Sequence, residues 1–126
     1  MTENQLAGIA FNCGLRVHRE LGPGLLENVY EECLYYELSK YNIDVQRQVP
    51  IRVKYDGVEL NAKLKADIII DNKVLLELKS VSQLDPIHTA QTLTYLKMTD
   101  IKLGLLMNFN EELYKSGFKR IINGKL

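Results

Sequence analysis

The sequence predicts one α/β (α+β) domain over residues 1–126, with a central mixed β-sheet flanked by α-helices. Two observations predict this fold class. The 126 residues are 46% hydrophobic and 25% charged, which is the size and composition of a single globular domain. Apolar residues repeat first with helical and then mostly with strand spacing, in the order helix, helix, strands, helix, strand.

The first two elements are helices. Over residues 6–21 apolar side chains recur every three or four positions, which is typical of an amphipathic helix. The Gly-Pro-Gly at residues 22–24 ends it, and a second helical pattern covers residues 26–41. Cys13 and Cys33 lie in these patterns without a Cys-x-x-Cys spacing, so we expect reduced, buried thiols rather than a disulfide or a zinc site.

Strands and a third helix follow. Apolar runs, many of them alternating or β-branched, predict strands at residues 43–49, 51–55, 66–70, 74–79, 103–109 and 118–122. Pro50 divides the first two strands, and Asp56-Gly57 is a hairpin signal. Asp85 as N-cap and Pro86 at the first helical position predict a helix over residues 86–98.

The register of the hairpin around residues 71–73 follows from its apolar faces. Side chains alternate along a strand, so Ala66, Ile68 and Ile70 share one wholly apolar face. The returning strand has a matching apolar face that begins at Val74. The two faces lie together against the core when Ile70 pairs with Val74.

This register places two carboxylates opposite each other. Asp67 lies directly across from Glu77 on the other face, and Lys79 lies two residues further along. Opposed carboxylates repel unless a cation lies between them, and Mg²⁺ is the usual solution. Such a metal activates water and polarises a phosphodiester, while an ammonium stabilises the transition-state charge. A lone Glu-x-Lys on a strand is otherwise a common surface pair.

Asp67, then nine residues, then Glu77-Leu78-Lys79 resembles the PD-(D/E)XK nuclease superfamily. Residues 24–30, which run from Gly24 through Glu27 to Tyr30, are similar to one of its small families, the GxxExxY proteins. Further similarity to that family occurs in residues 17–23, 65–67, 91–97 and 104–109. The similarity covers nearly the whole chain.

The resemblance implies a restriction-endonuclease-like core and a site for Mg²⁺ or Mn²⁺. Its ligands would be Asp67, Glu77, the carbonyl of Leu78 and Glu27. Lys79 would activate water or stabilise charge, with Glu27 and Gln91 assisting. Glu27 also lies in the first turn of its helix, where an acid is favoured by the helix dipole, so cap and ligand both remain open.

Other residues are expected to line the site. Lys65 stands where the family commonly has arginine, and in the predicted register it faces Lys79 across the hairpin. Tyr30 is expected in the core, with its hydroxyl on a site carboxylate. Tyr95 lies one helical turn from Gln91 and faces the same way, although an exposed helix face is the alternative. His88, in the first turn of the third helix, is expected to approach the site.

The charge balance bears on function. The chain has 16 Lys+Arg and 16 Asp+Glu, whereas nucleic-acid binders usually carry a basic excess. Acids gathered in a metal site would leave the remaining surface net positive, and residues 115–126 carry four bases and no acid. The first hypothesis is a metal-dependent phosphodiesterase acting on DNA or RNA. The alternatives are a catalytically inactive binding or assembly module and a hydrolase of small phosphates.

Partners and location complete the expectations. A neutral domain binds nucleic acid poorly unless a homodimer or a partner protein supplies a basic surface. The longest apolar runs are far below the ~20 residues that span a bilayer, so we expect no membrane span. Residues 1–10 lack the basic and apolar regions of a signal peptide, so we expect a cytoplasmic protein.

Overall fold

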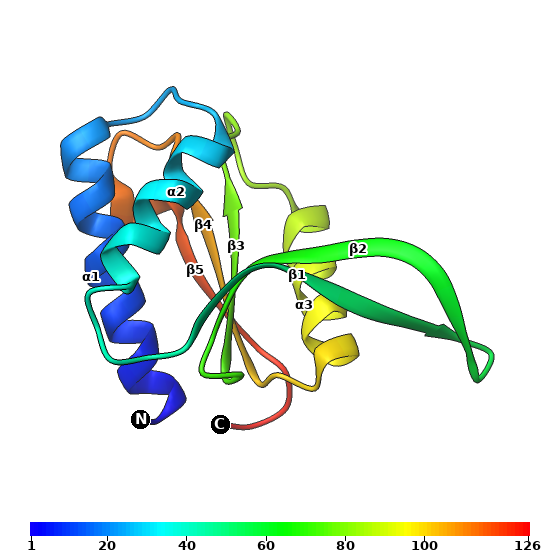
Figure 1. Cartoon of the computed structure of the whole chain (residues 1–126). Coiled ribbons are helices and arrows are strands. Elements are labelled where there is room, and N and C mark those ends of the chain that lie inside the picture. Colours follow the sequence, from blue (N-terminus) through cyan, green and yellow to red (C-terminus); the bar gives the residue numbers. More distant parts are fainter.

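The structure is a computed structural model that describes residues 1–126 and contains three α-helices and five strands (Figure 1). In chain order the elements are α1 (Glu3–Leu21), α2 (Glu27–Leu38), β1 (Val45–Tyr55), β2 (Val58–Ile70), β3 (Val74–Lys79), α3 (Pro86–Thr99), β4 (Leu103–Asn108), a 3₁₀ turn η1 (Tyr114–Gly117) and β5 (Phe118–Ile122). None of the helices has the length and apolar character needed to cross a bilayer.

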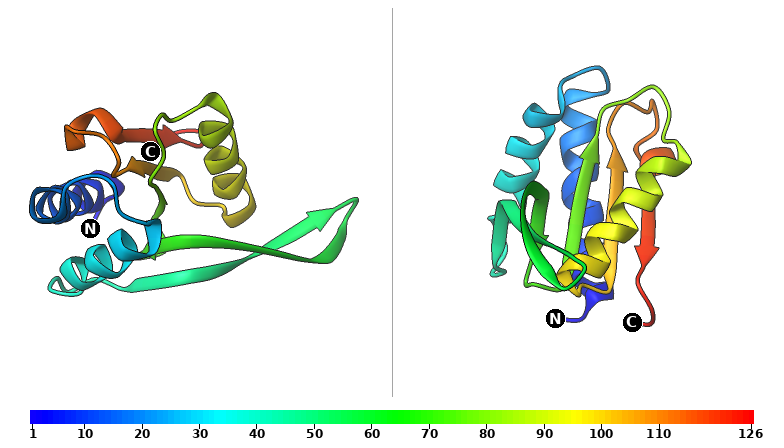
Figure 2. Two further views of the ribbon diagram at one scale, coloured as in Figure 1. Left: turned by 90° about the horizontal axis from the view of Figure 1, so that it is seen from above. Right: turned by 90° about the vertical axis from the view of Figure 1, so that its right-hand side faces the viewer.

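The five strands form one mixed sheet in the order β1-β2-β3-β4-β5. Strands β3 and β4 are parallel, and every other neighbouring pair is antiparallel. Helix α3 makes the crossover between the two parallel strands and lies on one face of the sheet, whereas α1 and α2 lie on the other (Figures 1 and 2). This arrangement confirms the expected mixed sheet flanked by helices.

The sheet has a buried core on each face. Leu76 and Leu105 point toward α1 and α2, and Leu75 and Leu106 point toward α3. Strands β3 and β4 are therefore covered on both sides, which explains why their sequences are almost uninterrupted apolar runs. Both cysteines are free thiols; Cys13 is buried and Cys33 is half-buried, packed against the core.

The first hairpin differs from the sequence prediction. We expected two strands divided near Pro50, but β1 continues through this proline, which pairs with Lys65 of β2. Because β1 is an edge strand, a residue without an N–H is tolerated there. Strand β2 begins at Val58 rather than at Ala66, directly after the predicted Asp56-Gly57 turn.

The outer part of this hairpin, residues 52–63, projects past α3 and away from the body of the molecule (Figures 1 and 2). We call this segment the arm. Nearly all its side chains are exposed, and none belongs to either buried core. Its large apolar residues Tyr55, Val58 and Leu60 are exposed, so the arm adds little to the buried interior.

The hairpin twists where it leaves the sheet. Gln48 has a left-handed backbone conformation, with φ of 49°, and it lies between two regular stretches of β1–β2 pairing. The side of β2 that faces each core changes near this point. Ile68 and Ile70 belong to the core under α1 and α2, but Ala66 belongs to the core under α3. The expectation that these three side chains share one face was therefore wrong.

Candidate active site

Two carboxylates meet where β2 and β3 separate. The predicted pairing of Ile70 with Val74 is confirmed. Further along, the Asp67 N–H donates to Glu77 Oε1 (3.2 Å), and the Leu78 N–H donates to Asp67 Oδ2 (2.8 Å). Each carboxylate thus replaces a bond of the strand ladder, and the pair is fixed by backbone groups of both strands.

The environment of the pair opposes a double negative charge. Glu77 is only 5% exposed. Burial, and then the neighbouring Asp67 carboxylate, raise the pKa of Glu77 from 4.5 to about 8. Burial also raises the pKa of Asp67. The Lys79 ammonium is near enough to lower both pKa values partly, but it forms no ion pair with either group.

The donor set fits a hard divalent cation. One oxygen of Asp67 and one of Glu77 accept backbone N–H groups, and the second oxygen of each accepts no hydrogen bond within the protein. The chain has no group of three or more His, Cys, Asp or Glu side chains arranged to hold a metal. An ion at this pair would therefore take its other ligands from backbone oxygens and water, as Mg²⁺ commonly does.

Helix α2 directs two more acids toward the pair. Glu27, its first residue, is exposed, and its charge contributes to the raised pKa values of both Asp67 and Glu77. Glu31, one turn later and 7% exposed, raises the pKa of Asp67 further. Sequence reasoning missed Glu31, although its spacing of four residues from Glu27 places both on one helix face.

Glu31 is held by the strand beneath it. Arg47 Nη2 lies 2.9 Å from Glu31 Oε2, and Gln48 Nε2 donates to Glu31 Oε1 over 2.6 Å. Both carboxylate oxygens are therefore occupied, so Glu31 fixes α2 against β1 rather than offering a free ligand. The left-handed backbone of Gln48, which no sequence signal indicated, accompanies this contact.

Helix α3 closes the other side of the pair. Gln91 Nε2 donates to the Tyr95 hydroxyl over 3.1 Å, so the two side chains face the same way as their spacing predicts. Tyr95 is 8% exposed. Burial and then the charge of Glu77 raise the pKa of Tyr95, and Asp67 adds to this shift, which places the phenol beside the carboxylates.

Tyr30 has a different role from the one expected. Its hydroxyl donates to the Gly22 carbonyl (2.6 Å) and accepts from the Leu25 N–H (3.1 Å). Its ring is fully buried and stacks on Phe109 with centroids 4.7 Å apart. The core placement is right, but the hydroxyl binds the loop before α2 and not a site carboxylate, because that loop supplies the nearer backbone groups.

Two further candidates make other contacts. His88 Nδ1 accepts the N–H of Asp85, so the ring caps the start of α3, and it forms no hydrogen bond or ion pair with either carboxylate. Lys65 is exposed and pairs with Pro50 of β1. The expected juxtaposition of Lys65 with Lys79 does not form, because β2 turns away from β3 at the hairpin twist.

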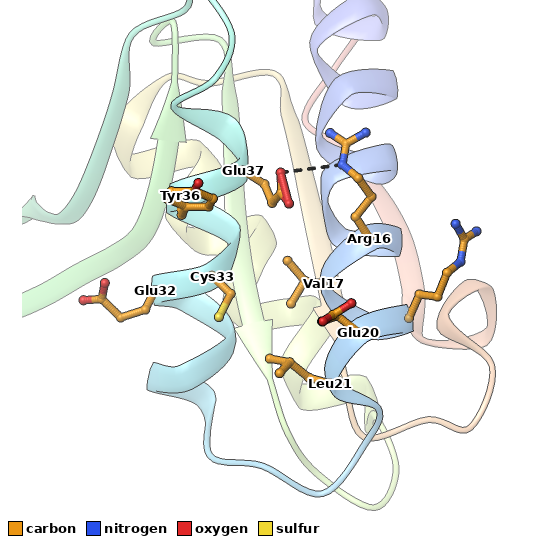
Figure 3. Close-up of a pocket in the computed structure, with 9 residues that line it drawn as sticks. Arg16, Val17, Glu20, Leu21, Glu32, Cys33, Tyr36 and Glu37 are labelled. Carbon is orange, nitrogen blue, oxygen red and sulfur yellow. Dashed lines mark ion pairs between the residues drawn. The ribbon is translucent and has the colours of Figure 1, made fainter.

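The surface hollows lie elsewhere. None of the four is lined by Asp67 or Glu77. One hollow of about 520 Å³ lies between α1 and α2, and all nine of its lining residues come from these two helices (Figure 3). It contains Cys33 and the Arg16–Glu37 ion pair, and it is separate from the carboxylate site.

Comparison with known proteins gives one match. A family model described as the PD-(D/E)XK nuclease superfamily matches residues 4–121. This span includes all of α1 but its first residue, all of α2, the carboxylate pair and all of β5 but its last residue. No match was found among curated proteins or among solved structures.

Proposed function

The chain belongs to the PD-(D/E)XK nuclease superfamily, and from that premise we propose that it is a metal-dependent phosphodiesterase acting on nucleic acid. The observation that carries the proposal is the buried pair of Asp67 and Glu77, opposed across two strands with no cation in contact. Mutual repulsion and burial make such a pair costly unless a metal ion joins it. A nuclease-type function follows from the family, and the pair supplies a place for its chemistry.

The proposed roles divide between two strands and two helices. Asp67, Glu77 and the Leu78 carbonyl would hold Mg²⁺ or Mn²⁺, and Glu27, whose charge reaches both carboxylates, would assist as a ligand through water. When bound, such an ion lowers the pKa of its water and polarises a phosphodiester. The Lys79 ammonium, near both carboxylates, orients the attacking water and stabilises the charge that develops on the phosphate. Gln91, held by the Tyr95 hydroxyl, contacts a phosphate oxygen from the α3 side.

We further propose that the chain is a GxxExxY protein, because each motif residue has a physical role here. Gly24 has φ of 99°, a conformation that favours glycine. Glu27 opens α2 on the side of the carboxylate pair. The Tyr30 hydroxyl forms hydrogen bonds with the backbone of Gly22 and Leu25. These bonds fix the loop that precedes Glu27.

The test is cleavage of single- and double-stranded DNA and RNA with Mg²⁺ or Mn²⁺, beside Glu77→Gln and Lys79→Met. We expect each variant to lose about 100-fold or more in kcat, the typical cost of removing a group that stabilises transition-state charge. Glu112→Gln and Lys125→Met, at exposed positions, are the matched controls and should cleave normally. Cleavage that persists in both site variants would refute the proposal.

The neutral net charge favours a second candidate, a nuclease-fold binding or assembly module without catalysis. In that case the basic surface would come from a second copy or a partner protein, and every substrate would remain intact with either metal. Hydrolysis of small phosphates is separated by comparing turnover of mononucleotides with turnover of polymer. A protein that turns over only mononucleotides would support that reading instead.

A further inference from the structure

The arm and α3 enclose a basic hollow of about 550 Å³. Arg52 and Lys54 line it from β1, and Thr94, Lys97 and Met98 line it from α3. Three of the five lining residues are cations and none is an acid. A hollow lined by one sign of charge concentrates the opposite charge.

The cations of this hollow are largely free. Lys54 and Lys97 form no ion pair in the structure. Arg52 Nε lies 3.6 Å from Glu59 Oε1, but the two side chains are 81% and 53% exposed, so this pair is weak. Glu59 is also the cross-strand partner of Lys54. It is therefore the acid that most directly opposes anion binding here.

Helix α3 reaches both the hollow and the surroundings of the carboxylate pair. Gln91, Thr94 and Lys97 follow at three-residue steps and form a slanted row, in which Gln91 and Lys97 are turned about 120° apart around the helix axis. Gln91 bonds to Tyr95, which lies beside Glu77. At 1.5 Å per residue, Gln91 and Lys97 are separated by about 9 Å along the helix axis.

We propose that this basic hollow binds the phosphate backbone of a nucleic-acid strand whose neighbouring nucleotides reach the carboxylate pair. The inference rests on the proposed function. It accounts for phosphate binding by a chain with no net charge, because Asp67 and Glu77 lie at the proposed metal site while three cations and no acid line the hollow. The basic segment of residues 115–126 is the competing surface, but its Lys119 and Arg120 already bond to Thr89 and Asn4.

The experiment measures binding of fluorescein-labelled single-stranded DNA by anisotropy, in EDTA so that no cleavage occurs, over a series of salt concentrations. We expect Lys54→Gln/Lys97→Gln to bind roughly tenfold more weakly and to reduce the salt slope by about 1.4, at about 0.7 per lost phosphate contact. The control Lys115→Gln/Lys125→Gln removes the same charge from the competing segment and should keep the wild-type slope.

Glu59→Gln is expected to change the binding affinity in the opposite direction. It removes the acid that opposes Arg52 and Lys54, so we expect binding about two- to fivefold tighter, the size of one exposed charge interaction. A role of these residues in folding alone would not produce tighter binding. Circular dichroism should show all variants folded, because the substituted side chains are exposed.

The proposal is overturned if the wild-type chain does not bind, if Lys54→Gln/Lys97→Gln keeps the wild-type affinity and slope, or if the control pair weakens binding equally. These outcomes are separable from failure of the proposed function. A chain that binds through the hollow but never cleaves contradicts only the nuclease proposal. A chain that cleaves while the double variant binds normally contradicts only the present inference.

Discussion

Glu77 is a carboxylate in a place where a carboxylate is costly. It is buried in a strand that packs on both faces, and its nearest charged neighbour along β2 is another carboxylate, Asp67. Its pKa of about 8 means that the metal-free folded protein carries it largely protonated at neutral pH. A bound cation would reverse this preference, because it favours the charged form.

The first prediction concerns pH and the stability of the metal-free protein. The pKa of Glu77 rises from 4.5 to about 8 on folding, so its stabilising contribution is full below pH 4.5 and is lost as the pH rises through about 8. Glu77→Gln should remove this dependence and unfold about 1–3 kcal/mol less readily than wild type in alkaline, metal-free buffer. Thermal unfolding at several pH values measures the effect.

Magnesium and a surface control complete this test. Mg²⁺ should raise the Tm of the wild type and leave the Tm of Glu77→Gln nearly unchanged, because a ligand stabilises only the state that binds it. Glu112→Gln changes an exposed carboxylate and should keep the pH dependence of the wild type. Identical pH profiles for wild type and Glu77→Gln would contradict the shifted pKa.

For single residues, the sequence predicts which side chains pair across the hairpin between β2 and β3. It does not predict where the hairpin twists. The predicted pairing of Ile70 with Val74 is confirmed and brings Asp67 into contact with Glu77, although Ala66 does not share the face of Ile68 and Ile70. Lys65 does not reach Lys79 because the hairpin of β1 and β2 twists away from β3 near Gln48. The left-handed backbone of Gln48 could not be predicted, because glutamine does not favour this conformation. The roles of the site residues remain proposals, whatever their geometry.

Helix α1 contains two glycines, Gly8 and Gly14, with different surroundings. A Cβ on Gly14 would overlap the Tyr114 hydroxyl and come within 2.7 Å of Met107 Cε. A Cβ on Gly8 would have no atom within 4 Å. Gly14 therefore permits close packing of α1 on β4 and η1, whereas Gly8 only costs helix propensity.

The second prediction follows from this contrast. Gly8→Ala should raise the free energy of unfolding by about 0.5–1 kcal/mol, because alanine favours the helix. Gly14→Ala should lower it by about 1–3 kcal/mol through overpacking. Chemical denaturation of both variants provides the measurement, and each serves as the control of the other. Equal effects of the same sign would show that α1 does not pack as described.

Element boundaries were predictable where turn or capping residues mark them. Asp85-Pro86 marks the start of α3, and Asp56-Gly57 marks the hairpin turn. The start of β2 was missed although its first half alternates between apolar and polar residues from Val58 to Leu64; these side chains are exposed up to Lys63. Pro50 suggested a break because proline has no N–H to donate to a sheet. Strand β1 lies at the edge of the sheet, where this is tolerated.

For the molecule as a whole, stability should be uneven. Strands β3 and β4 lie between two cores, whereas the arm belongs to neither. Amide exchange of Leu75 and Leu105 should require nearly global unfolding, and amides of the arm pair Val53 and Leu60 should exchange at least about 100-fold faster. Native-state hydrogen exchange followed by NMR makes the comparison residue by residue. Equal protection of the arm and of β3 would contradict it.

Because the arm belongs to neither core, its sequence can change more freely than the rest of the chain during evolution. Residues 52–63 can change in length, sequence or charge at little cost in folding free energy, because few buried contacts depend on them. Asp67 and Glu77 lie between the two cores and have no such freedom. If the arm binds nucleic acid as proposed, chains that share this fold can change which nucleic acid they bind without changing the carboxylate pair.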